Sequence, residues 1–358
     1  MNSAPVASVS TSVYRFPTAY PEADGTFEWA ETTAVAVEVS ARGEIGLGWT
    51  YSSPAAASVV EHHLAPAIAG HDAFDVSGAW RAMHRAGRNV GTRGLYLQAL
   101  SAVDVALWDV KAKLLGVPVT ALLGRCRDGV RVYGSGGFTN QTQSQFADQV
   151  AGWLDAGCTA VKIKIGRDWA SDARRVRWLR TLSRDVEVMV DANGAYSLGE
   201  ARRRGAQLDE LGVTWFEEPV SSDDVAGLGE LRLALRCDVA AGEYVSDVYD
   251  AARLVPVVDC LQLDATRCGG YTGFLAGAAL AASANREVSA HCAPSLHAPV
   301  ALAVPNVRHV EWFADHARLE PVLFENVPVV QDGRLTMASD APGHGMRLSD
   351  RAAEFRTA

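Results

Sequence analysis

The sequence predicts an α/β protein with a closed barrel of parallel strands, preceded by a smaller unit of mixed α and β structure. From about residue 129 onward, short runs rich in β-branched residues alternate with amphipathic helical segments. Eight such runs can be distinguished, and a strand–helix unit repeated eight times favours a barrel over an open sheet. The chain has 358 residues, and a barrel of about 250 residues leaves room for an additional unit.

The first 125 residues predict strands followed by helices. Thr32–Val39 alternates apolar and polar residues, and Glu44–Tyr51 is a second strand that contains glycines. Ala55–Ala69 and Leu95–Leu115 have the apolar spacing of helices, and the second ends at a Gly-Val-Pro sequence. Proline and glycine in Phe16–Gly25 predict a loop, and its low apolar content predicts a mobile one with few contacts.

The barrel elements follow in order. The predicted strands are Val130–Tyr133, Ala160–Ile165, Val186–Val190, Thr214–Phe216, Asp238–Ala241, Cys260–Leu263, Glu287–Ala290 and His309–Trp312. The predicted helices between them include Gln143–Ala156, Trp169–Leu182, Leu198–Leu211 and Tyr249–Val257. The last segment, Val322–Ala358, has strand-like and loop character but no further strand–helix unit.

Composition restricts the class of protein. With 33 basic and 42 acidic residues, the formal charge of −9 argues against nonspecific binding to nucleic acid or to an anionic membrane. The six cysteines are scattered, without a C-x-x-C pair, and the N-terminus does not resemble a signal peptide. We therefore expect a soluble cytoplasmic protein with free thiols.

Seven successive barrel strands end on ionisable residues. Active sites of such barrels lie at the C-terminal ends of the strands, so these side chains should converge on one mouth. Solvation alone does not explain so regular a pattern. In chain order the residues are Lys162 and Lys164, Asp191, Glu217 and Glu218, Glu243, Asp264, His291, and Glu311.

Three of these carboxylates predict a metal site. The steps from Asp191 to Glu217 and from Glu217 to Glu243 are both 26 residues, which places them at similar heights on adjacent strands. Clustered carboxylates repel one another and raise one another's pKa, and a hard divalent cation removes that repulsion. Ligation by oxygen alone with open positions suits Mg²⁺.

The remaining strand ends predict two opposed bases. Lys162 and Lys164 are two residues apart in a strand, so both side chains face the mouth, and their proximity should lower the pKa of one ammonium group. Asp264 and His291 follow adjacent strands, where the carboxylate would fix the imidazole tautomer. Together these groups predict removal of a proton next to a substrate carboxylate that a metal binds.

The chain resembles the enolase superfamily, and within it the mandelate racemase subgroup, over nearly its whole length. The motifs that carry the resemblance are ALSAVDVALWDVKAKLLGVPV (99–119), AVKIKIG (160–166), VDANGAY (190–196), WFEEP (215–219), AAGE (240–243) and LQLDATRCGGYTG (261–273), with His291 and Glu311 after them. The resemblance implies a (β/α)7β modified TIM barrel at 126–321. It also implies an α+β capping domain at 1–125, to which the C-terminal tail at 322–358 returns.

The resemblance also implies residue roles. Asp191, Glu217 and Glu243 would bind Mg²⁺. Lys164 and the His291–Asp264 pair would be acid/base groups on opposite faces of the substrate. Lys162 would contact the substrate carboxylate and lower the pKa of Lys164, Glu311 would hydrogen-bond that carboxylate, and Asn193 would reach the substrate 2-hydroxyl. Glu218 is interpreted as a residue behind the ligands, and His297 as one without a catalytic role.

Three reactions use these same groups: dehydration of an acid sugar, racemisation or epimerisation, and lactone cycloisomerisation. We favour dehydration of an aldonate or aldarate to a 2-keto-3-deoxy acid, because the predicted capping loops carry polar groups, among them Tyr20, that suit a polyhydroxy acid. A non-catalytic sugar-acid-binding protein is the remote alternative. Such a protein would be expected to have lost a base or a metal ligand, and all of these groups are present here. The expected partner is a small hydroxy acid, and we expect a homo-oligomer.

Overall fold

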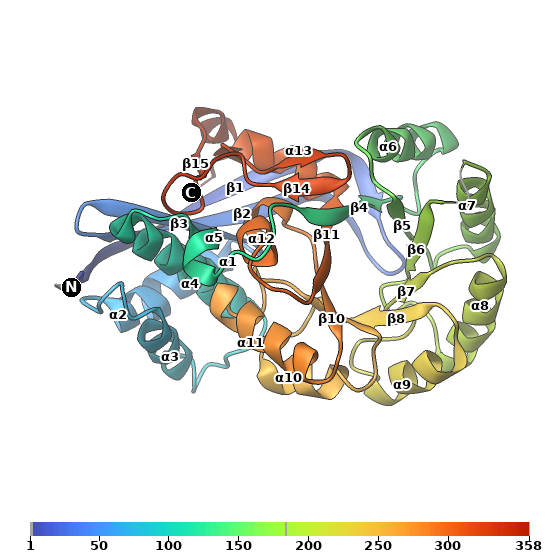
Figure 1. Cartoon of the computed structure of the whole chain (residues 1–358), viewed down its shortest axis with the longest axis horizontal. Coiled ribbons are helices and arrows are strands. Elements are labelled where there is room, and N and C mark those ends of the chain that lie inside the picture. The colour runs from blue at the N-terminus through green and yellow to red at the C-terminus, as the bar shows by residue number, and fades with distance from the viewer. Residues whose placement is uncertain (1–2, 183–184, 358) are drawn as a thin grey trace.

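The computed structural model describes residues 3–182 and 185–357, which form an eight-stranded parallel barrel with a cap at one end (Figure 1). The strands follow one another around the ring in chain order, and pairing of the first with the last closes it. The barrel therefore confirms the predicted fold class. Its strands are β4 (Val130–Gly136), β5 (Ala160–Lys164), β6 (Glu187–Asp191), β7 (Trp215–Glu217), β8 (Asp238–Ala241), β9 (Cys260–Leu263), β10 (Glu287–Ala290) and β11 (Val307–Phe313).

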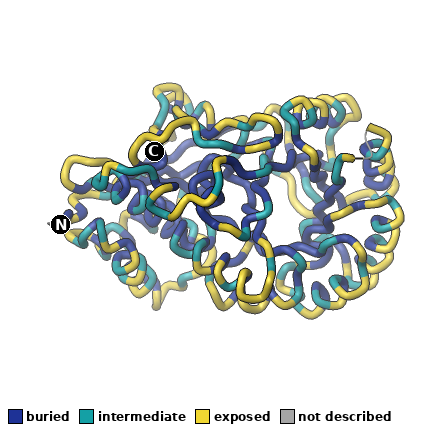
Figure 2. Tube along the Cα trace, viewed as in Figure 1, coloured by how far each residue is buried: buried dark blue, intermediate teal, exposed yellow. Residues whose placement is uncertain are grey.

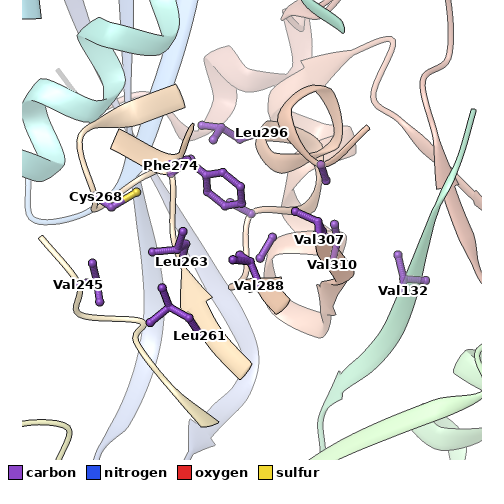
Figure 3. Packing of buried hydrophobic residues seen from close by; sticks show 14 of the residues in the cluster. Val132, Val245, Leu261, Leu263, Cys268, Phe274, Val288, Leu296, Val307 and Val310 are labelled. Carbon is purple, nitrogen blue, oxygen red and sulfur yellow. The ribbon is translucent and has the colours of Figure 1, made fainter. Parts of the chain in front are cut away.

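Helices surround the barrel on its outer side. Burial separates the layers in Figure 2, where the strands are dark blue and the outer faces of the helices are yellow. Figure 3 shows Phe274 of one helix and Leu296 of the next close to Val288 of β10, within one apolar cluster. The helices are α6 (Gln143–Asp155), α7 (Trp169–Leu182), α8 (Leu198–Glu210), α9 (Val225–Ala234), α10 (Val248–Leu254), α11 (Gly270–Ser283), α12 (Pro294–Ala301) and α13 (Ala314–Leu323).

The cap is an antiparallel sheet of three strands covered by helices. Strand β2 (Glu28–Ala41) lies between β1 (Val6–Ala23) and β3 (Glu44–Tyr51). Helix α4 (Leu95–Leu115) packs against β3, and its long apolar surface is buried. The predicted helix over Ala55–Ala69 is present as α1 (Ala55–Val59), a π-helical turn η1 (Val60–Leu64) and α2 (Ala65–Ile68). Helices α3 (Val76–Ala86) and α5 (Val119–Leu123) were not predicted.

The C-terminal segment contacts both parts of the molecule. Strands β13 (Val329–Gln331) and β14 (Arg334–Thr336) form a hairpin that pairs with β4 of the barrel. Strands β12 (Phe324–Glu325) and β15 (Arg347–Leu348) pair with each other, and the 3-10 helix η2 (Asp350–Phe355) lies beside β1. The Thr357 amide donates to the carbonyl of Val13 at 2.8 Å. The division of the chain at residues 125 and 321 stays a prediction.

The predicted loop at Phe16–Gly25 is wrong, because β1 continues to Ala23. Its pairing with β2 shifts register between Pro17 and Glu22, and an edge strand tolerates proline at such a bulge. The β1–β2 hairpin reaches across to the barrel (Figure 1), where Arg167 donates to the carbonyls of Asp24 and Phe27. The expected shortage of contacts in this segment is therefore wrong as well.

None of the helices in the two described ranges is long and apolar enough to cross a membrane. The longest of them, α4, carries buried Asp104 and Asp109 within its 21 residues.

Close packing of β3 on α4 predicts a strong effect of one methyl group. A Cβ atom added at Gly48 would lie 2.1 Å from the carbonyl oxygen of Ala102 and 2.7 Å from the amide of Ala106. Because both atoms belong to the helix backbone, we expect Gly48→Ala to lower the free energy of unfolding by about 3 kcal/mol. Chemical denaturation measures this effect.

Gly152 on the exposed face of α6 is the matched control, since a Cβ there meets no atom within 4 Å. Gly152→Ala should stabilise the protein by about 0.5–1 kcal/mol. A Gly48→Ala protein as stable as the parent would contradict the close packing of cap sheet and helix.

Candidate active site

A polar cavity of about 410 Å³ lies between the cap and the C-terminal ends of the barrel strands. Its barrel wall consists of residues that follow the strands, and its cap wall comes mainly from β2 and the end of β3. Helix α13 adds Asp315 and His316. The barrel residues are Lys164, Asn193, Glu243, Tyr244, Asp264, Thr266, Arg267, His291, Cys292 and Phe313, and the cap residues are Asp24, Phe27, Trp29, Glu31, Thr32, Thr33, Tyr51 and Ser52.

The three predicted metal ligands meet at this wall. Asp191 and Glu217 are the last residues of β6 and β7 and are paired in register. Glu243 lies two residues beyond the end of β8. It is three residues further along the chain than Ala240, the residue that pairs with Glu217. One oxygen of each carboxylate lies within 4.8 Å of the others, and all three side chains are buried.

The charges in this cluster fit a divalent cation. Burial and the neighbouring Asp191 raise the pKa of Glu217 to about 8. Burial and Glu243 raise the pKa of Glu218 well above its usual value. Among the described residues, Oε1 of Glu218 has no hydrogen-bond partner, and Oε2 of Glu243 has only the ion pair with His291 at 3.3 Å. Crowded, buried carboxylates with unused oxygens are suited to hard cations that prefer oxygen ligands.

Lys162 and Lys164 both point into the barrel, as strand alternation predicts. Nζ of Lys162 lies 2.6 and 2.7 Å from the two oxygens of Glu217 and 2.8 Å from Oε1 of Glu311. Nζ of Lys164 lies 2.5 Å from Oδ2 of Asp191. Nζ of Lys162 also lies 3.7 Å from the same Oδ2 of Asp191, so the two ammonium groups share this carboxylate.

The expected lowering of a lysine pKa is wrong for this arrangement. Burial lowers the pKa of Lys164 and so does Lys162, but Asp191, with smaller contributions from Glu217 and Glu243, raises it above its usual value. Burial also lowers the pKa of Lys162, while Glu217 and Glu311 raise it well above the usual value. Because carboxylates outnumber ammonium groups, both lysines stay protonated unless a cation offsets the carboxylate charge.

The predicted pair of Asp264 and His291 is present. Nδ1 of His291 lies 2.9 Å from Oδ2 of Asp264, whose other oxygen accepts from the amide and hydroxyl of Thr266. Nε2 of His291 lies 3.3 Å from Oε2 of Glu243. Burial lowers the pKa of His291, but Cys292, Glu243 and Asp264 raise it well above its usual value. In this arrangement the neighbouring acidic groups favour the protonated form of the imidazole.

Glu311 is a buried acceptor at the base of the site. Its oxygens accept from the Ser135 hydroxyl at 2.5 Å and from the Cys292 amide at 2.8 Å. Burial raises the pKa of Glu311, but Lys162 and His291 lower it below its usual value, so the carboxylate is ionised. Its predicted contact with a substrate carboxylate stays a prediction.

The two predicted substrate contacts outside the ionisable set differ. Asn193 lines the cavity, and its buried Oδ1 has no hydrogen-bond partner within the described residues. The structure does not bring Tyr20 to the cavity: its hydroxyl contacts Nε2 of Gln141 at 2.8 Å. Its contact with a substrate stays a prediction; in the present arrangement β1 pairs with β2 and does not fold over the mouth as a loop.

His297 has a structural role, as interpreted from the sequence. It is fully buried, its Nε2 accepts from the amide of Ala265, and its Nδ1 lies 2.9 Å from the carbonyl oxygen of Cys292.

Sequence reasoning missed two residues that contact the carboxylates of the site. Nη1 of Arg267 lies 3.2 Å from Oε1 of Glu243, and its Nε lies 3.4 Å from Oδ2 of Asp264. Nε1 of Trp215 donates to Oε2 of Glu217 at 2.9 Å. Trp215 is two residues before Glu217 in one strand, and this spacing could have indicated a shared face. Arg267 is three residues after Asp264, but its direction depends on the turn that follows β9.

Two family models match the chain. Residues 11–124 match the "mandelate racemase / muconate lactonizing enzyme, N-terminal domain", and residues 145–352 match the "enolase C-terminal domain-like" family. The chain therefore belongs to the mandelate racemase subgroup of the enolase superfamily, which confirms the resemblance drawn from its motifs.

Relatives with named activities match over most of their length. The L-talarate/galactarate dehydratase of Salmonella typhimurium is 33% identical over 334 residues, which cover 90% of this chain and 82% of the relative. Its structure with Mg and L-lyxarohydroxamate has a TM-score of 0.92 and covers 100% of this chain and 94% of that chain. The 3,6-anhydro-alpha-L-galactonate cycloisomerase of Streptomyces coelicolor is 32% identical and covers 96% of this chain and 97% of the relative.

A mandelate racemase/muconate lactonizing enzyme-like protein from Rubrobacter xylanophilus has been solved by crystallography. It has a TM-score of 0.96 and 41% identity, and the match covers 99% of this chain and 100% of that chain.

Removing the central ammonium group should destabilise the protein strongly. Lys162→Met leaves Glu217 and Glu311 buried without their counter-charge, so we expect a loss of about 3–5 kcal/mol in the free energy of unfolding. Denaturant unfolding without divalent cations measures it. Lys111→Met is the control: Lys111 lies over the Trp108 ring, and its loss should cost less than about 1 kcal/mol. Equal losses in both variants would contradict a central role for Lys162.

Proposed function

We propose that the protein is a magnesium-dependent dehydratase of acid sugars, which removes the proton at C2 and the hydroxyl group at C3 to give a 2-keto-3-deoxy acid. The observation that carries this proposal is the placement of Lys164 and His291. Lys164 ends β5 and His291 follows β10, two strands that are not neighbours in the ring, and each contacts one carboxylate of the Asp191–Glu217–Glu243 cluster. A base and an acid on opposite faces of a bound substrate suit this elimination.

Asp191, Glu217 and Glu243 would hold Mg²⁺. When bound, the ion would supply the positive charge that stabilises charge developing on the substrate carboxylate. Its charge would also offset the carboxylate that now binds Nζ of Lys164 and would lower the pKa of that lysine toward the range of a base. Arg267 and Trp215 would keep two of the ligands in position.

The two faces have different tasks in this proposal. Lys164 accepts the C2 proton at Nζ, and the C2–H electron pair forms the new double bond as the C3–O bond breaks. His291, which Asp264 and Glu243 favour as an imidazolium, donates its Nε2 proton to the leaving hydroxyl, and water departs. The enol product then becomes the keto acid.

Dehydration is favoured over the alternatives because the cavity is lined by hydroxyl and amide groups suited to a polyhydroxy acid, such as those of Thr32, Ser52 and Asn193. An isomerase, either a racemase or a cycloisomerase, is the second candidate, since the same two opposed groups serve a proton exchange between faces.

A homo-oligomeric state and a cytoplasmic location also remain predictions.

Metal dependence is the first test. We expect chelation to abolish activity and Asp191→Asn to reduce Mg²⁺ binding measured by calorimetry, because a neutral amide is a weaker ligand than a carboxylate. Asp155→Asn, an exposed position at the end of α6, should bind Mg²⁺ like the parent. Full activity of the Asp191→Asn protein in chelator would contradict the metal site.

The second test separates the two faces. Loss of one proton-transfer group typically costs 10²–10⁴-fold in rate, so we expect losses of this size in both Lys164→Met and His291→Asn. In D₂O, Lys164→Met should lose both C2 exchange and keto-acid formation. His291→Asn should retain exchange and lose product. Exchange in Lys164→Met without exchange in His291→Asn would reverse the two roles, and parental turnover in both variants would exclude the proposed reaction.

A further inference from the structure

Another group of potential metal ligands lies beside the three carboxylates. It consists of His291, Cys292 and Glu311, which offer a nitrogen, a sulfur and an oxygen atom. One ligand atom of each residue lies within 4.8 Å of the others, and all three side chains are buried. This mixed set differs from the Asp191–Glu217–Glu243 cluster, which offers oxygen alone. Nitrogen and sulfur are the ligand atoms that zinc prefers.

The backbone at Cys292 brings its sulfur to the same side as the imidazole. Side chains alternate along an extended chain, so consecutive residues ordinarily point in opposite directions. Cys292 has a φ of 51°, in the left-handed region, which breaks this alternation. Its Sγ lies 3.3 Å from Nε2 of His291, and both residues line the cavity. An ion in the cavity can therefore reach the nitrogen and the sulfur together.

We propose that Nε2 of His291, Sγ of Cys292 and Oε2 of Glu311 form an inhibitory site for Zn²⁺ and similar divalent cations that prefer sulfur. Tetrahedral zinc has bonds of about 2.0–2.3 Å, which place neighbouring ligand atoms about 3.3–3.6 Å apart. Nε2 lies 3.3 Å from Sγ and 3.8 Å from Oε2, close to this spacing. The cavity supplies the entry path and the space for a fourth ligand.

The surroundings hold the ligands in suitable positions. Nδ1 of His291 lies 2.9 Å from Oδ2 of Asp264. Histidine ligands of zinc usually donate their other ring N–H to a carboxylate in this way, which fixes the ring and its tautomer. Oε1 of Glu311 pairs with Lys162, whereas Oε2 accepts the amide of Cys292 at 2.8 Å. A carboxylate oxygen has two lone pairs, so Oε2 can also bind an ion.

Zinc binding requires the loss of the thiol proton. Burial and Glu311 raise the pKa of Cys292 to about 12, so the thiol is neutral near pH 7 without a metal. A metal ion deprotonates the thiol that it binds, and the proton leaves to solvent, together with the Nε2 proton where the imidazole carries one. The thiolate and the Glu311 carboxylate then balance the two charges of the ion. Mg²⁺ prefers oxygen ligands, so the two kinds of cation are sorted by ligand type.

The ion would occupy the group that the proposed reaction uses as its acid. With zinc on Nε2, His291 has no proton to donate to the leaving hydroxyl. Nε2 also lies 3.3 Å from Oε2 of Glu243, so zinc would lie beside a proposed magnesium ligand. The inhibitory effect rests on the proposed function, whereas the binding site does not. We therefore expect zinc to block dehydration even in excess Mg²⁺.

Co²⁺ is the probe for the site, because it adopts the geometry of zinc and its thiolate complexes absorb in the near ultraviolet. It is added in excess Mg²⁺ to the parent, to Cys292→Ser and to Cys126→Ser, and Zn²⁺ is then titrated against the absorption. We expect a thiolate band that zinc removes in the parent and in Cys126→Ser, whose thiol is exposed. Cys292→Ser should lack the band. Circular dichroism checks that each variant is folded.

Inhibition is the second measurement, with each rate taken relative to the same variant without zinc. Cys292→Ser should need more than about 100-fold more zinc than the parent, because loss of a ligand costs more than the 10–100-fold typical of an outer partner. No thiolate band in the parent, or a band that persists in Cys292→Ser, overturns the site. Equal zinc inhibition of the parent and Cys292→Ser overturns the inhibitory role. A band that depends on Cys292 in a protein that forms no keto acid supports the zinc site and overturns dehydration.

Discussion

The fully buried ammonium group of Lys162 neutralises carboxylates that come from two other strands of the barrel. It binds Glu217 from β7 and Glu311 from β11, strands that lie on either side of β5 in the ring. Buried charges are tolerated only when they are paired, so these three side chains depend on one another for the fold to be stable. The consequence for chemistry is that Glu217 is held in place before any cation arrives, while Asp191 is held in the same way by Lys164.

This pairing also explains why the site changes character with its ligands. Without a divalent cation the lysines neutralise the carboxylates and are kept from acting as bases. The negative charge of Asp191 raises the pKa of Lys164. A cation bound to the carboxylates would offset this charge and lower the pKa of the lysine. If Asp191 binds the metal as proposed, metal binding and generation of the base would be coupled through it, because Asp191 also binds Nζ of Lys164.

Much of this site could be predicted because barrel geometry converts a sequence pattern into a spatial one. Ionisable residues at the C-terminal ends of the strands all lie at the same mouth of the barrel. Asp191, Glu217, Asp264 and His291 could therefore be grouped without a structure. Local patterns failed where pairing decides conformation: the prolines of β1 indicated a loop, yet the strand continues because β2 covers its inner edge. The pKa of Lys164 could not be predicted from its spacing to Lys162, since it depends on how many carboxylates surround both. Arg267 was missed for a similar reason, because its direction is set by the turn after β9.

The two walls of the cavity come from different parts of the fold, which separates the residues for proton transfer from those that would contact the far end of the substrate. The groups that would move protons, Lys164 and His291, lie at or just after the ends of barrel strands, so the register of the sheet sets their positions. The groups that would meet the far end of a substrate come from β2, the end of β3 and the first turn of α13, which are joined by the hydrogen bond between Thr32 and Asp315. Changes in that second set alter charge and shape at the cap end without disturbing the network around Lys162. Chemistry that is common to the superfamily can thus be kept while the accepted acid changes, because the residues at the cap end do not belong to the barrel strands.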